Sequence, residues 1–211
     1  MKILYKKPTM KRLLLLLLLF TGMANAQIVN IPDANFKATL LSASPTAQIA
    51  QDFNDQWIKI DADNDGEIQE SEAEAIKALV ISEFLIFNTT GLNSFSNLES
   101  LRFTNSLIVT LDVSALTNLK TITCQNLPIL NTLTANNLPN LTEISCFNLN
   151  NLNNLNISNL NNLSKLSCLS TSIDNLSLSG FTNLTEILFL GNITNSMNLS
   201  GLTNLTKLNC S

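Results

Sequence analysis

Twelve consecutive residues, Asp61 to Glu72, hold the densest set of side chains in this sequence that could do chemistry. Carboxylates stand at the first, third and fifth positions of this segment, as Asp61, Asp63 and Asp65, and Glu72 is the twelfth. Oxygen donors at alternate positions suit a hard divalent cation, because Ca²⁺ takes roughly six to eight oxygen ligands. Gly66 at the sixth position permits the sharp turn that converging carboxylates need. The segment therefore predicts a Ca²⁺ site.

The spacing matches the calcium-binding loop of EF-hand proteins at each diagnostic position, including an aliphatic residue at position eight. The predicted ligands are the side chains of the three aspartates, a backbone carbonyl, a glutamine acting directly or through water, and a bidentate glutamate: Asp61, Asp63, Asp65, Glu67, Gln69 and Glu72. The last ligand would lie in the first turn of a helix predicted over 71–80. An acidic turn that only caps this helix is the alternative, but four carboxylates so close together repel one another without a cation. Residues 56–60 alternate like a strand, which favours an unpaired or incomplete EF-hand with a structural site.

Catalytic chemistry is poorly supported by the rest of the sequence. The chain contains no histidine, and its one tyrosine is Tyr5, which excludes a Ser/His/Asp or Cys/His nucleophile and a zinc site that needs histidine. A carboxylate pair remains, Glu143 and Glu186, with Lys165 between them on successive repeats. Their predicted separation of roughly 10 Å fits inverting glycoside hydrolysis. Alternating charges on an exposed sheet are more typical of a solvated ion-pair column, so we predict no enzyme.

The first 26 residues have the pattern of a secretory signal peptide. Five bases and no acid precede the apolar run Leu13 to Phe20, and small residues flank Asn25 just before Gln27. The apolar run is far shorter than the roughly 20 residues that span a bilayer. We expect cleavage after Ala26, from a start at Met1 or Met10, and a product that is secreted or held at the cell surface without a transmembrane segment.

Charge divides the mature chain near residue 83. Removal of the signal peptide leaves seven bases against sixteen acids, a net charge of −9, which makes nucleic-acid binding unfavourable. Residues 27–83 carry eleven of these acids, whereas residues 84–211 carry five. In the first part, Pro32 and Asp33 suit a helix start, and Phe36, Leu40 and Leu41 form its apolar stripe. We predict a small helical calcium-binding cap at 27–83, followed by a second domain at 84–211.

The second domain is an internal repeat. The dipeptide Asn-Leu recurs six times at intervals of 21 or 22 residues, beginning at Asn97, Asn118, Asn140, Asn162, Asn183 and Asn204. Each copy continues with inward apolar positions, and a second short apolar alternation follows halfway round each repeat, for example at Leu111 and Val113. This period predicts a leucine-rich repeat solenoid of the α/β type, dominated by short parallel β-strands, in which successive coils stack about 4.8 Å apart.

Two further residue types repeat with the coil. The asparagine before each leucine is expected to hydrogen-bond turn backbone and to stack as a ladder inside the bend. The four cysteines, Cys124, Cys146, Cys168 and Cys210, take the inward position that phenylalanines fill in other repeats. Parallel strands hold such Cβ atoms about 4.8 Å apart, whereas a disulfide needs roughly 3.8 Å. We therefore predict buried free thiols.

The solvent side of the first strand of each coil predicts where a partner docks. Two residues after the leucine of each later Asn-Leu pair, opposite charges alternate at Glu143, Lys165, Glu186 and Lys207, an arrangement that suits strand register. Further along the same strands, four large apolar residues gather on coils three to five: Phe147, Leu169, Leu188 and Leu190. A contiguous apolar group rimmed by charge is typical of a docking surface, although a missing C-terminal segment folding over it is the alternative.

The Leu-Thr-Asn-Leu corners at 116–119 and 202–205, with the 21 to 22 residue period, resemble the internalin type of bacterial leucine-rich repeat. The order of signal peptide, Pro-Asp-Ala-Asn-Phe-Lys segment, Asp-Gly-Glu-Ile-Gln loop and Asn/Cys-rich repeats resembles secreted repeat proteins of the Bacteroidota. This resemblance implies a non-enzymatic extracellular scaffold that binds a protein or glycan. A structural or adhesive surface protein, or an accessory module of a longer secreted protein, is the alternative. Because Cys210 and Ser211 fall inside a repeat strand, we expect a truncated C-terminus.

Overall fold

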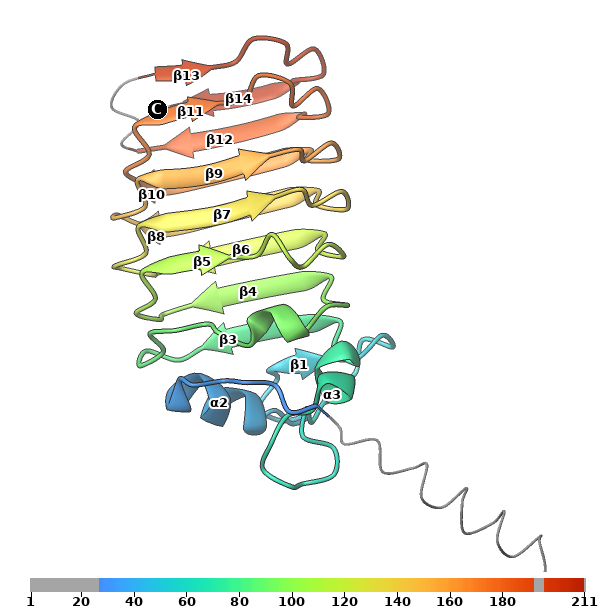
Figure 1. Cartoon of the computed structure of the whole chain (residues 1–211). Coiled ribbons are helices and arrows are strands. Elements are labelled where there is room, and N and C mark those ends of the chain that lie inside the picture. Colours follow the sequence, from blue (N-terminus) through green and yellow to red (C-terminus); the bar gives the residue numbers. More distant parts are fainter. Residues whose placement is uncertain (1–26, 192–195, 211) are drawn as a thin grey trace, which may run out of the picture.

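The computed structural model describes residues 27–191 and 196–210 and shows a stack of coils on a small mixed cap (Figure 1). The predicted signal peptide and Ser211 lie outside the described residues. The cap contains α2 (Ala34–Leu41), β1 (Ala50–Gln51), β2 (Trp57–Ile58) and α3 (Glu70–Glu74). Within the described residues, no helix is long and apolar enough to cross a membrane.

The main sheet has nine strands and runs from the cap to the last described coil. Seven of its strands are parallel and come one from each coil: β3 (Ala78–Ser82), β4 (Ser100–Thr104), β6 (Thr121–Gln125), β8 (Glu143–Leu149), β10 (Lys165–Thr171), β12 (Glu186–Leu190) and β14 (Lys207–Cys210). The antiparallel strands β1 and β2 extend the sheet at the cap end. This strand order confirms the repeat solenoid that the 21 to 22 residue period predicts.

Beyond the first coil, the opposite side of the described coils is also extended rather than helical. The strands β5 (Thr110–Asp112), β7 (Thr132–Asn136) and β9 (Asn154–Ser158) form one parallel sheet, and β11 (Asn175–Ser177) and β13 (Ser196–Asn198) form another. A 3₁₀ turn, η1 (Leu92–Ser94), occupies this side of the first coil. Leucine side chains from both sides meet in one continuous core, in which almost every repeat leucine is fully buried.

The helix predicted over 71–80 is wrong beyond Glu74. The helix α3 ends there, and Ala78–Ser82 is the strand β3, paired residue by residue with 100–104 of β4. A run of apolar and β-branched residues fits a pleated, largely buried surface, and pairing with β4 overrides the local helical periodicity. The sheet therefore contains one parallel strand more than the six predicted repeats.

The asparagines of the Asn-Leu pairs join each coil to the one before it. Each side-chain amide donates to a backbone carbonyl 22 or 23 residues earlier, at 2.6 to 3.0 Å: Asn97 to Glu74, Asn118 to Ser96, Asn140 to Thr117, Asn162 to Pro139, Asn183 to Asn161 and Asn204 to Thr182. The turn carbonyls, which lack sheet partners, are satisfied in this way. The predicted hydrogen bonds to turn backbone are confirmed, but the predicted place inside the bend is wrong, because these asparagines lie at its surface.

The cysteines form a column of free thiols inside the sheet. Cys124, Cys146 and Cys168 are paired in register on neighbouring strands and are buried. Burial raises the pKa of Cys124 well above its usual value, and a hydrogen bond with Cys168 together with burial does the same for Cys146. Cys210 is exposed, against the prediction, because β14 is the outermost strand of the described sheet and no described coil covers it.

Two contacts fasten the cap to the first coils. The ring of Phe36 on α2 lies 6.3 Å from the ring of Phe103 on β4, and both side chains are fully buried. Asp33 caps α2 through Oδ1, while its Oδ2 accepts the backbone N–H groups of Phe87 and Asn88 at 2.8 and 3.0 Å. Burial opposes ionisation of this carboxyl, but the four N–H donors prevail and lower its pKa.

Phe36 belongs to the cap, but it packs against Phe103 of the array. Truncating Phe36 should therefore destabilise both the cap and the array. We expect Phe36→Ala to lower the free energy of unfolding by about 3–5 kcal/mol. Urea unfolding followed by Trp57 fluorescence, which reports the cap, and by far-UV circular dichroism, which reports the strands, should shift to the same extent. Phe53→Ala is the control, because that ring is 52% exposed. A shift of the fluorescence transition alone would show that cap and array unfold independently.

The thiol column predicts selective reactivity. In the native protein, Ellman's reagent should modify one thiol of four per chain, because only the exposed Cys210 is accessible and thiolate formation at the buried sites is disfavoured. All four should react after unfolding in guanidinium chloride. The variant Cys210→Ser should show no rapid reaction while folded, and rapid modification of that variant would contradict the buried placement of the other three.

Candidate calcium site and binding face

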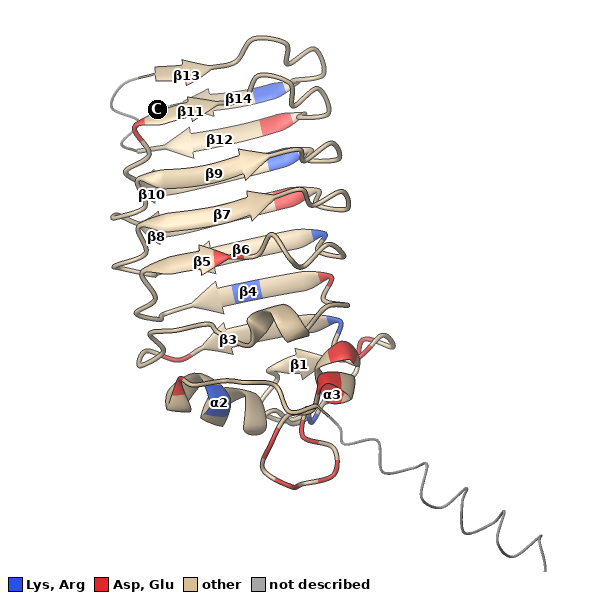
Figure 2. Ribbon diagram, viewed as in Figure 1, with Lys and Arg blue, Asp and Glu red and all other residues tan. Residues whose placement is uncertain are grey.

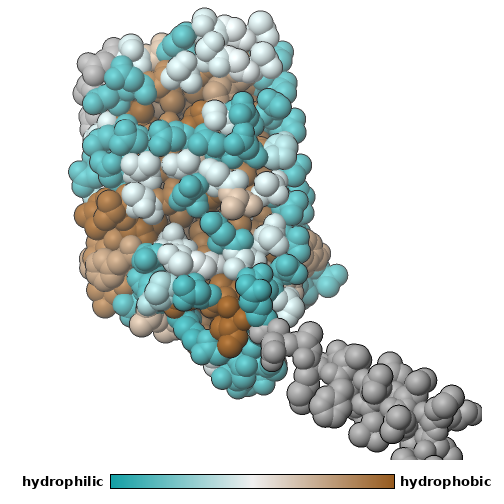
Figure 3. All heavy atoms as spheres, viewed as in Figure 1, coloured by the Kyte–Doolittle hydropathy of each residue, from teal (hydrophilic) through white to brown (hydrophobic). Residues whose placement is uncertain are grey.

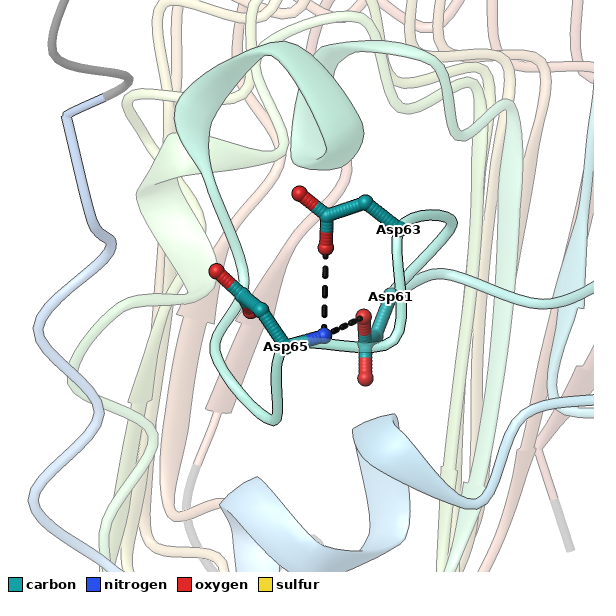
Figure 4. A group of neighbouring side chains, drawn as sticks. All are labelled: Asp61, Asp63 and Asp65. Atoms are coloured by element: carbon teal, nitrogen blue, oxygen red, sulfur yellow. Dashed lines mark hydrogen bonds between the residues drawn. The ribbon is translucent and has the colours of Figure 1, made fainter.

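The acidic loop of the cap connects β2 to α3 and gathers three carboxylates (Figure 4). One carboxylate oxygen from each of Asp61, Asp63 and Asp65 lies within 4.8 Å of the others. Asp61 Oδ1 and Asp63 Oδ1 both accept the backbone N–H of Asp65 at 3.2 Å. Gly66 follows with φ of +83°, in the left-handed region that favours glycine. The turn thus brings the three aspartate carboxylates together.

Glu72 closes the loop from the far end. Its Oε1 accepts the backbone N–H of Ala62 at 2.6 Å, and its Oε2 accepts that of Gln69 at 3.0 Å. Gln69 in turn donates through Nε2 to Asp65 Oδ2 at 2.8 Å. The structure therefore links the first, fifth, ninth and twelfth positions of the loop through hydrogen bonds.

Glu67 holds a different place from the other acids. Its carboxylate forms an ion pair with Lys37 of α2 at 2.6 Å. Its side chain is therefore engaged away from the aspartates, which is consistent with the prediction that this residue offers its backbone carbonyl.

Two neighbours of the loop have no counterpart in the sequence prediction. Lys59 Nζ lies 3.9 Å from Asp61 Oδ2 and also hydrogen-bonds Asn64, so a lysine ammonium already balances part of the negative charge. The buried Ile68 accepts the backbone N–H of Val29 at 2.8 Å, in an isolated antiparallel bridge between Ile28 and Gln69. Residues 28 and 29 thus pair with the end of the loop. A short apolar segment without periodicity gives no sequence signal for such a bridge.

Charged residues alternate in sign along one end of the parallel strands (Figure 2). The predicted column Glu143, Lys165, Glu186 and Lys207 is in register, and Glu186 contacts Lys207 at 2.5 Å. The hydrogen bond from Lys207 lowers the pKa of Glu186, so this carboxyl is ionised rather than a proton donor near neutrality. The alternation continues toward the cap through an ion pair of 2.8 Å between Glu99 and Lys120, one position earlier in the repeat.

The four predicted docking residues lie on the solvent side of the main sheet. Phe147, Leu169 and Leu190 are direct neighbours on β8, β10 and β12, and Leu188 faces Ser167. They alternate with the buried residues Cys146, Cys168 and Phe189, which confirms their outward orientation. They are half-buried rather than exposed, because each side chain covers its neighbours along the row.

Comparisons with known proteins find similarity only among solved structures. No protein-family model and no curated protein matches the chain. The functional domain of InlJ from Listeria monocytogenes, described as including a cysteine ladder, is 23% identical with a TM-score of 0.37; the match covers 88% of this chain and 47% of that domain. The internalins InlF and InlC2 of the same species are 19% and 18% identical, with TM-scores of 0.33 and 0.37. Those matches cover 89% and 88% of this chain, and 79% and 98% of theirs.

This chain thus spans about half the length of the InlJ domain it matches. Because these identities and TM-scores are low, the fold is assigned from the strand pairing of this chain itself. The architecture is that of a parallel β-solenoid of about six turns.

Proposed function

We propose that the protein is a non-enzymatic extracellular binding scaffold whose cap holds a structural Ca²⁺ ion. The observation that carries the scaffold role is the apolar row of Phe147, Leu169 and Leu190 on an in-register sheet face whose other outward residues are mostly polar. The expected partner is a protein or glycan outside the cell. Export is supported by the N-terminal sequence pattern alone.

The calcium role follows from the donor set of the loop. Three converging aspartates, Gln69 and Glu72 offer several hard oxygen donors, and the backbone turn that presents them is fixed by its own hydrogen bonds. When bound, Ca²⁺ would neutralise carboxylates that otherwise repel one another at this distance. The loop also pairs with Val29, and residues 29–31 lie so close to Gly91 of the first coil that no side chain would fit there. Ordering the loop would therefore reinforce the cap where it meets the array.

Calcium titration tests the metal site. Calorimetry on the chain from Gln27 should show one site with a Kd on the order of 10⁻⁴ to 10⁻³ M, as in extracellular modules. The double variant Asp61→Asn with Glu72→Gln should lose this heat. Glu70→Gln with Glu74→Gln makes the same change in charge on α3 outside the predicted ligand set, and it should bind as the parent does.

Calcium at a hundredfold excess over its Kd should also raise the free energy of unfolding by about 2.7 kcal/mol. This increase should be seen by Trp57 fluorescence and by circular dichroism alike. Heat release from the Asp61/Glu72 double variant equal to that of the parent would refute the assignment.

Substitution on the sheet face tests the scaffold role. The double variant Phe147→Ser with Leu190→Ser should reduce capture of a cell-surface partner by the immobilised chain at least tenfold, because truncating central apolar anchors typically costs more than 1 kcal/mol of binding free energy. Since both side chains are half-buried, a loss of about 1–2 kcal/mol in unfolding free energy is expected.

The control exchanges two exposed apolar residues away from this face, Phe53→Ser and Val109→Ser, and should capture the partner normally. Undiminished capture by a folded Phe147/Leu190 variant would show that the partner, if any, binds elsewhere.

A further inference from the structure

A second ladder of asparagines follows the end of the parallel strands. Asn105, Asn126 and Asn148 occupy equivalent turn positions of successive coils, each with a left-handed backbone at φ of 53° to 56°. Asn126 Nδ2 donates to Asn105 Oδ1 at 3.1 Å, and Asn148 Nδ2 donates to Asn126 Oδ1 at 3.0 Å. Asn105 begins the ladder by donating to Ser82 Oγ at 3.2 Å. All three carboxamides are exposed and held in a fixed orientation.

A groove of about 330 Å³ lies along this ladder. It is lined by the three asparagines with Asn150, Pro128 and the ring of Phe84, and none of these six residues is charged. Phe84 is 56% exposed. Figure 3 shows apolar surface at the left edge of the lower coils. Five of the eight exposed large apolar side chains in the described residues belong to the loops that follow β3, β4 and β6: Phe84, Leu85, Phe87, Val109 and Ile129.

The carboxamides retain hydrogen-bonding capacity toward solvent. An asparagine side chain has two N–H donors and two acceptor lone pairs, and the ladder uses one of each at Asn126. Each rung therefore offers one donor and one acceptor side by side. A hydroxyl group, which both donates and accepts, complements such a rung, whereas a carboxylate or an ammonium group satisfies only half of it. An exposed aromatic ring next to the rungs adds a flat apolar surface of the kind on which the C–H face of a pyranose stacks.

The spacing of the rungs favours a sugar chain over a peptide. Successive coils are about 4.8 Å apart, whereas side chains on one face of an extended peptide repeat at roughly 6.6–6.8 Å. An extended peptide laid along the ladder would lose register after two rungs. A pyranose unit in a linear glycan is close in length to the rise of one coil, so its hydroxyls can meet rung after rung.

We propose that this groove binds a linear neutral glycan, with one sugar ring against Phe84 and the following hydroxyls on Asn105, Asn126 and Asn148. The uncharged lining favours a neutral over an anionic polysaccharide, because none of the six lining residues carries a cation to pair with an acid group. This site is distinct from the apolar row on the sheet face, and it gives the scaffold a second binding surface at its edge.

Calorimetric titration of the chain from Gln27 with cellohexaose, mannohexaose and maltohexaose tests the site. We expect saturable binding of at least one of these neutral hexasaccharides, unaffected by salt. Phe84→Ala should weaken it at least tenfold, and Phe84→Tyr, which keeps the ring, should retain it. Asn126→Gly keeps the left-handed backbone while removing the carboxamide, and it should also weaken binding at least tenfold.

Phe87→Ala is the matched control, because that ring is equally exposed at 56% but does not line the groove. Its affinity should equal that of the parent. The proposal is overturned if none of the three hexasaccharides binds at millimolar concentration, or if Phe84→Ala binds as well as the parent. Tighter, salt-sensitive binding of a hyaluronan oligosaccharide, or tighter binding of an uncharged Gly-Ser peptide, would overturn it as well.

Discussion

The fold depends on one constraint, the in-register parallel stacking of coils about 4.8 Å apart. A single coil of 21 or 22 residues cannot bury its leucines, so every coil obtains its core from the next. The coils must stay in register at the turns as well as in the strands, because a turn carbonyl that points toward the next coil needs a hydrogen-bond donor from that coil. The asparagines of the Asn-Leu pairs supply that donor, each contributing on the order of 1 kcal/mol. The asparagine-rich composition is therefore a structural consequence of stacking.

The same constraint leaves an open edge where the stack begins, and the cap covers it. The antiparallel strand β1 pairs with β3, and the fully buried Phe36 fills the space over the first coils. Lys77, just before β3, donates a hydrogen bond to Asp55 in an ion pair of 2.6 Å. This hydrogen bond raises the pKa of Lys77. Charge pairing that begins in the cap thus continues as the alternating column of the array.

Sequence periodicity predicts the repeated parts of this structure well and the unique parts poorly. The six Asn-Leu repeats locate six parallel strands and the cysteine column, because each position recurs with the same environment. The strand β3 carries no Asn-Leu signature, and its identity depends on pairing with β4, which no local pattern records. The acidic spacing locates the carboxylates that converge, whereas Lys59 and the bridge to Val29 arise from tertiary packing. Exposure at Cys210 likewise depends on what covers the last strand and not on the residue itself.

A solenoid built in this way separates stability from recognition. Inward positions are fixed by core packing and the turn asparagines by carbonyl pairing, but outward strand positions and exposed loops contact little else and can change at small energetic cost. Apolar residues at such outward positions therefore need an explanation other than the stacking of coils.

Two surfaces depart in this way from the polar repeat: the apolar row on coils three to five and the loop that carries Phe84. The first lies on the face of the sheet, and the second lies at its edge beside a ladder of neutral amides. A flat apolar row suits a partner that excludes water over a broad area, whereas a narrow groove of paired donors and acceptors suits a hydroxylated chain. The two surfaces consequently favour ligands of different chemistry, and the rigid register between coils holds both in fixed relation to each other.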